Sequence, residues 1–86
     1  FLAAALSDPA LEDHHARNSH ALTERLARLL GAADPRLADV EERAATLAAA
    51  VEGIATLAAG NPAQWPAERQ RRALERVIAA VQAPGA

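Results

Sequence analysis

The feature that most constrains the fold is an alanine-rich segment, residues 34–60, in which apolar residues follow a helical repeat. They recur in alternating steps of three and four, which places them on one side of a helix. These positions are Leu37, Val40, Ala44, Leu47, Val51, Ile54 and Ala58. Asp34 followed by Pro35 is typical of a helix start, and Gly60 is typical of a helix end. The sequence therefore predicts a helix over residues 34–60.

The second half of this predicted helix is apolar on nearly every side. Up to Arg43, the side opposite the apolar stripe carries charges, as expected for a surface helix. From Ala44 onward, only Thr46, Glu52 and Thr56 add polar side chains. A helix that is apolar nearly all round must be covered on more than one side. We therefore expect this half to lie between its own subunit and a second copy of the chain.

Two more helices are predicted on either side of this segment. Asp8 followed by Pro9 favours a helix over residues 9–30 that ends at Gly31. Its inward positions are Leu11, His15, Asn18, Leu22, Leu26 and Leu29. A last helix, residues 66–82, follows a two-proline connection. Its inward positions are Leu74, Val77, Ile78 and Val81. Strand-type alternation is missing from the sequence, which predicts an all-α antiparallel helical bundle.

Length and composition narrow the choice of function. The 86 residues form one domain, residues 1–86, and we expect this domain to be a fragment of a longer protein because residues 1–6 resemble a helix end without a start. A lone chain of this size hides only about 60–65% of its unfolded surface, so contact with more protein would add stability. The formal charge of −2 and the lack of cysteine argue against a nucleic-acid surface and a disulfide framework. Without a membrane-length apolar run or a signal-peptide pattern, we expect a cytoplasmic protein.

Three polar residues near the start of the helix over residues 9–30 are candidates for a small-molecule pocket. These are His14, His15 and Asn18. His15 and Asn18 fall on the inward stripe, and small-molecule sites are mostly apolar cavities with a few polar groups. Alternatively, these residues are ordinary hydrogen-bonded groups, or they face a part of the protein outside this chain. Glu52 could also orient a ligand, although we expect it to face water or to pair with an arginine of the last helix, because isolated buried charges are costly.

Metal binding and catalysis have little support in the sequence. The helical spacings of His20 with Glu24 and of Glu12 with His15 belong to no recognised motif, so we expect no metal. Cysteine and tyrosine nucleophiles are missing, so we expect no enzymatic activity and no cofactor. A face of the last helix alternates arginine with glutamate, which is typical of an ion-paired surface rather than a nucleic-acid patch. Its residues are Glu68, Arg69, Arg71, Arg72, Glu75 and Arg76.

Gly53 lies inside the predicted long helix, where glycine costs about 1 kcal/mol relative to alanine. A close helix crossing at the interface between two subunits would account for its presence. The residues expected at this dimer interface are Leu47, Val51, Gly53, Ile54, Leu74, Val77, Ile78 and Val81.

Three segments, taken in order, resemble parts of one known family. FLAAALSDPAL is similar to the family's break after the first long helix of its regulatory domain. ADPRLADVEERAATLAAAVEGIATLAAG resembles the penultimate helix, in which an acidic residue, a glycine and an aliphatic residue recur, here Glu52, Gly53 and Ile54. NPAQWPAERQRRALERVIAAV resembles the last connection and helix, although Trp65 stands where a serine or aspartate cap is more usual. Together they resemble the C-terminal ligand-binding and dimerisation domain of TetR-family transcriptional regulators.

This resemblance implies a structure and a mechanism. The last two helices of each subunit would form a four-helix bundle across a homodimer two-fold. A small-molecule effector would bind between the preceding helices and release a transcriptional repressor from DNA. The helix-turn-helix that binds DNA in this family precedes the domain and is absent from this chain. The alternative function is a stand-alone helical module that binds a partner protein without any effector.

Overall fold

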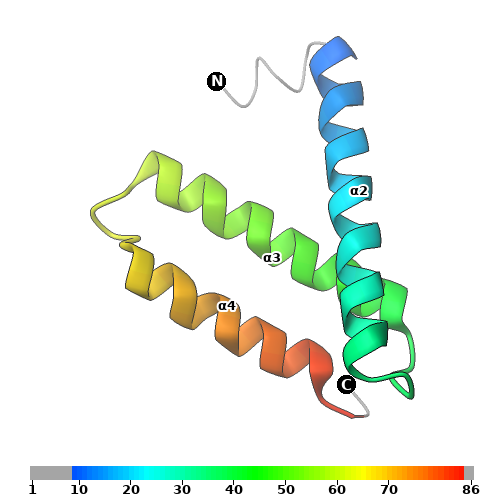
Figure 1. Cartoon of the computed structure of the whole chain (residues 1–86). Helices are drawn as coiled ribbons and strands as arrows, with labels where there is room; N and C mark the ends of the chain where they lie inside the picture. Colours follow the sequence, from blue (N-terminus) through cyan, green and yellow to red (C-terminus); the bar gives the residue numbers. More distant parts are fainter. Residues whose placement is uncertain (1–8, 85–86) are drawn as a thin grey trace.

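The computed structural model describes residues 9–84, with side chains from residue 16 onward. Its three α-helices are α2 (Pro9–Ala33), α3 (Val40–Gly60) and α4 (Ala67–Gln82). Strands are absent from residues 9–84, which confirms the all-α class for this part of the chain. α3 and α4 lie side by side and antiparallel, and α2 crosses the first half of α3 steeply (Figure 1). The helix end expected at residues 1–6 lies outside the described residues.

α3 begins at Val40, so the prediction of a helix start at Asp34 is wrong. The Asp34 side chain accepts a hydrogen bond from the Arg36 N–H at 3.1 Å, and its carbonyl accepts one from the Leu37 N–H at 3.0 Å. Aspartate followed by proline starts a turn here, because the same pair also suits the first two positions of a β-turn. The N-cap of α3 is Asp39, which has a left-handed φ of 53° and makes no side-chain capping bond.

Of the two glycines that were expected to end helices, Gly31 lies inside its helix, whereas Gly60 is the last residue of α3, as predicted. α2 continues past Gly31 to Ala33. α3 ends at Gly60, and the C-cap residue that follows, Asn61, has a φ of −148° and donates its N–H to the Leu57 carbonyl at 2.9 Å. Neither helix end therefore needs a left-handed glycine. α4 ends at Gln82 as predicted, and its N-cap residue is a proline.

The core is small and lies where the three helices meet. Its buried residues are Leu30, Ala44, Leu47 and Val81, and Leu26, Ala27, Leu37, Val40, Val51 and Val77 pack against them. The predicted apolar stripe thus packs against the core as far as Val51, whereas Ile54 and Ala58, farther along α3, are half-buried outside this cluster. Near the end of α2 the buried residue is Leu30, whereas Leu29, which was predicted inward, is 61% exposed. Asn18 is also exposed, although the stripe predicts it inward. A step of four from Leu26 fits the helical repeat as well as a step of three, so the sequence alone does not choose between Leu29 and Leu30.

The arrangement leaves much of the molecule uncovered. The structure measures 41 × 31 × 17 Å and has a radius of gyration of 14.5 Å, whereas a compact chain of this length would have about 12 Å. Its accessible surface is 6233 Å², compared with about 4,900 Å² for a globular protein of the same mass. A single subunit is therefore flat and open, which is the shape expected of a domain that packs against more protein.

Candidate functional site

A polar contact joins the middle of α2 to the middle of α3. Ser19 Oγ donates a hydrogen bond to Glu52 Oε1 at 2.7 Å, and both residues are half-buried. The Ser19 carbonyl accepts a bond from Thr23 Oγ1 at 3.0 Å. Glu52 does not pair with an arginine of the last helix, as one expectation had it, because the crossing of α2 supplies a closer partner; its half-buried side chain still reaches solvent. We call this pair, Ser19 and Glu52, the wedge pair.

The three predicted pocket residues precede the wedge pair on α2. Asn18 is exposed and directly precedes Ser19. His14 and His15 lie within α2, but their side chains are outside the described residues. The N-terminal half of α2 extends beyond α3 (Figure 1). The structure therefore adds a half-buried carboxylate and hydroxyl beside the predicted site. The sequence signal for this addition was Glu52, a single carboxylate in the apolar half of its helix.

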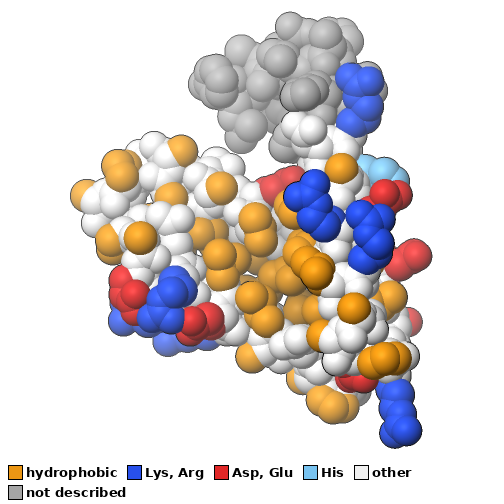
Figure 2. Space-filling model, in the orientation of Figure 1, with side chains coloured by type: hydrophobic (Ala, Val, Ile, Leu, Met, Phe, Trp, Pro, Cys, Tyr) orange, Lys and Arg blue, Asp and Glu red, His pale blue; other side chains and the backbone are white. Residues whose placement is uncertain are grey.

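Hydrophobic side chains gather on α3 and α4 in the angle that these helices form with α2 (Figure 2). Ile78 of α4 is 40% exposed, although the sequence predicts it inward. A groove of about 310 Å³ also lies along the polar side of α2, where its lining includes His20, Glu24 and Glu41. His20 Nε2 lies 2.8 Å from Glu24 Oε1. The part of the chain with described side chains contains no group of three potential metal ligands.

Arg43 is a buried charge that the sequence analysis did not single out. It is 8% exposed and donates from Nε to the Ala38 carbonyl at 2.7 Å. Its Nη1 donates to the carbonyls of Val81 and Ala83 at 2.8 and 2.7 Å. The last carbonyls of a helix have no partner within the helix, and the helix dipole favours a positive charge beside them. Arg43 therefore fastens the start of α3 to the end of α4.

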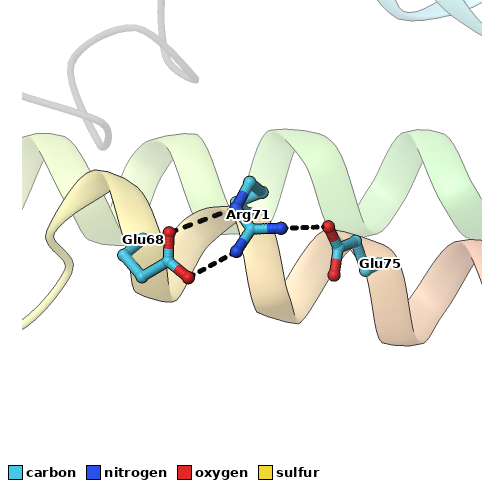
Figure 3. Close-up of polar contacts among 3 residues, drawn as sticks. All are labelled: Glu68, Arg71 and Glu75. Carbon is cyan, nitrogen blue, oxygen red and sulfur yellow. Dashed lines mark hydrogen bonds and ion pairs between the residues drawn. The ribbon is translucent and has the colours of Figure 1, made fainter.

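The exposed side of α4 carries ion pairs centred on one arginine, and Glu68 pairs with Arg71 rather than with Arg72, four residues on. Arg71 forms ion pairs with Glu68 and Glu75 (Figure 3). The hydrogen bond with Glu68, followed by the charge of Glu75, raises the pKa of Arg71 above its usual value. This guanidinium is therefore neutralised locally, so the predicted ion-paired surface holds for Glu68, Arg71 and Glu75, whereas Arg69, Arg72 and Arg76 form no ion pair with a described carboxylate.

Comparisons with known proteins bear on these observations. Residues 1–83 match the family described as "BetI-type transcriptional repressor, C-terminal". The chain matches no curated protein and no solved structure. Within the described residues, no helix is both long and apolar enough to span a membrane.

Proposed function

Because the chain belongs to the family of BetI-type transcriptional repressor C-terminal domains, we propose that it is the effector-binding and dimerisation domain of a TetR-type repressor. The family match confirms the resemblance to TetR-family regulators and supports this function over a stand-alone interaction module. In this proposal the protein is cytoplasmic, and DNA is bound by a separate N-terminal domain. The charge of −2 supports this division of roles, since DNA-binding surfaces are basic.

The observation that carries the homodimer is an uncovered face of α3. Ala45, Ala49, Gly53 and Leu57 are all exposed and follow one another at intervals of four residues. Residues at this interval form a continuous ridge along a helix, the kind of surface that packs into the groove of another helix. We call these four residues the α3 ridge. Its largest member, Leu57, is 51% exposed.

The polar groups near the α3 ridge are already satisfied within the helix. Thr46 Oγ1 donates to the Glu42 carbonyl at 3.1 Å, and Thr56 Oγ1 donates to the Glu52 carbonyl at 2.9 Å. Neither hydroxyl would therefore lose an essential water partner when a second subunit covers the ridge. This removes the main cost of burying a threonine, which is an unpaired hydroxyl.

Gly53 supports a close approach between subunits at the ridge. A Cβ atom built at this position meets no atom within 4 Å, so the subunit itself gives no steric reason for glycine. In the dimer, a neighbouring helix backbone close to this position would leave no room for a larger residue. The contact that glycine allows there would offset its lower helix propensity.

The remaining residues predicted at the interface differ in how far the subunit itself covers them. Leu47 and Val81 are buried, Val51, Ile54, Leu74 and Val77 are half-buried, and Ile78 is exposed. In the proposed dimer, the α3 ridge forms the direct contact, and the buried residues support it from behind.

For the effector, we propose a site beside the wedge pair that also includes the predicted residues His14, His15 and Asn18. A ligand that binds more tightly to one arrangement of α2 and α3 shifts the equilibrium between the two arrangements. Glu52 gives such a ligand a charged hydrogen-bond acceptor in a mostly apolar setting, as small-molecule sites require. This change in the arrangement of α2 and α3 would alter the distance between the two DNA-binding domains of the dimer. Effector binding and DNA binding would therefore be coupled.

This proposal predicts that Glu52→Gln, His15→Ala and Asn18→Ala raise the effector concentration needed for DNA release by about tenfold or more, as expected for losing a hydrogen bond to a charged group. The measurement is fluorescence anisotropy of labelled operator DNA bound to the full-length protein. The effector is first identified by thermal-shift screening of small lipophilic and aromatic compounds.

Operator affinity without the effector should stay unchanged in these variants. Arg28→Ala, an exposed change farther along α2, serves as the control and should release DNA as the wild type does. If all three site variants also release DNA at the wild-type effector concentration, the proposed site is wrong.

A further inference from the structure

The layer formed by α3 and α4 carries unpaired acidic groups at one end. Asp39 and Glu42, at the start of α3, are exposed and line a groove of about 530 Å³ together with Thr46 and Ala80. Arg43 lines the same groove, but its guanidinium donates to backbone carbonyls. Neither carboxylate forms an ion pair with another residue that the structure describes. We call Asp39 and Glu42 the acidic end.

A second groove, lined with arginines, extends from the connection before α4 to the second half of that helix. Its volume is about 290 Å³, and its lining residues are Trp65, Arg69, Arg72, Ala73 and Arg76. The Arg69 guanidinium lies 4.4 Å from the centre of the Trp65 ring and donates to the Gln64 carbonyl at 2.7 Å. Within residues 16–84, these three arginines form no ion pair with a carboxylate. We call this surface the arginine groove.

The acidic end and the arginine groove lie on the same side of the layer. Ala80 of α4 lines the groove at the acidic end. It follows Arg76 by four residues and Ala73 by seven, so all three share one side of α4. On α3, Thr46 lines the same groove and precedes Gly53 by seven residues, which places the α3 ridge on this side too.

This arrangement makes the face self-complementary in one orientation only. α3 and α4 are antiparallel (Figure 1), so the acidic end, at the start of α3, and the arginine groove, which begins at the start of α4 and extends to Arg76, are centred toward opposite ends of the layer. In a two-fold interface, each patch of one subunit meets its complement on the other. A two-fold axis perpendicular to the helices reverses their direction and brings the acidic end of each subunit to the arginine groove of the other. A two-fold axis parallel to the helices brings the two acidic ends together and the two arginine grooves together, which costs free energy.

We propose that charge sets the orientation of the dimer, with Asp39 and Glu42 of each subunit against the arginine groove of the second copy. The inference rests on the proposed homodimer and adds which ends of the two subunits meet. The α3 ridge supplies the apolar contact between them, and the two charged ends exclude the opposite orientation.

The test is a charge-reversal cycle on the full-length protein, with the dimer dissociation constant measured by analytical ultracentrifugation. Arg72→Glu and Glu42→Arg should each weaken the dimer about tenfold, because every reversal occurs twice across a two-fold and turns attraction into repulsion. The double variant Arg72→Glu/Glu42→Arg should return to within about threefold of the wild type. Arg28→Glu on α2 is the matched control and should leave the constant unchanged.

Salt provides a second readout. Between about 0.1 M and about 1 M salt the Debye length falls from about 10 Å to about 3 Å, so the wild-type dimer should weaken and the Arg72→Glu dimer should tighten. If both single variants dimerise with the wild-type dissociation constant, the proposed orientation is wrong. It is also wrong if the double variant is weakened by the product of the two single losses. Either result would leave the proposed dimer itself intact. A wild-type monomer would instead overturn the proposed dimer itself.

Discussion

Replacing Arg43 with leucine is expected to lower the free energy of unfolding by about 3 kcal/mol. The guanidinium satisfies carbonyls of Ala38, Val81 and Ala83, and leucine would remove this donor from all three, including the buried bond to the Val81 carbonyl. The lost bonds also join the start of α3 to the end of α4, so the core between the two helices should loosen. The measurement is urea unfolding of the full-length protein, followed by circular dichroism at one fixed protein concentration.

Two further variants separate the hydrogen bonds of Arg43 from its charge. Arg43→Lys keeps the charge but loses the planar fork of donors, so we expect a smaller loss of stability than with leucine. Arg28→Leu removes an exposed arginine and should change the unfolding free energy by less than about 0.5 kcal/mol. Buried charges can sometimes be replaced by apolar residues without loss. If the Arg43→Leu protein is as stable as the wild type, the same is true of this buried charge, and the bonds of Arg43 do not stabilise the contact between α3 and α4.

Gly53→Leu is expected to weaken the proposed homodimer about a hundredfold or more, because an added branched side chain prevents close helix contact at its centre. Light scattering on the eluate of a size-exclusion column measures the mass directly. Within one subunit the leucine has room, since nothing lies within 4 Å of a Cβ at this position. Folding of the subunit should therefore survive, and only association should fail.

Gly53→Ala gives this prediction a sharper control. In a subunit that stays alone, alanine would stabilise α3 by about 1 kcal/mol through helix propensity. In a dimer with closely packed ridges, the extra methyl group costs part or all of that gain. A Gly53→Leu protein that remains dimeric would rule out the α3 ridge as the contact.

The sequence predicted the helices better than their ends. The spacing of apolar residues located all three helices, and α4 agrees closely because it starts and stops at connections that contain proline. α3 was extended backward to Asp34 because aspartate followed by proline favours a helix start and a turn alike. Whether this pair starts a helix or a turn depends on where the preceding helix α2 ends, and the residues of the pair do not determine that.

The parts of the site that the sequence missed depend on contacts between distant residues. The wedge pair joins residues that are 33 positions apart, and the bond from Arg43 to Val81 spans 38 positions. Each depends on how two helices cross, which periodicity within one helix does not determine. The glutamate of the wedge pair still gave a signal, since it interrupts an apolar run. Arg43 gave none, because an arginine at the edge of a helical stripe is usually exposed.

In the proposed homodimer, two copies of this domain cover the open face of α3 and α4. Sedimentation equilibrium of the wild-type full-length protein at micromolar concentrations tests it most directly. We predict twice the mass of one chain across that range. The mass of a single chain at every concentration would contradict the claim.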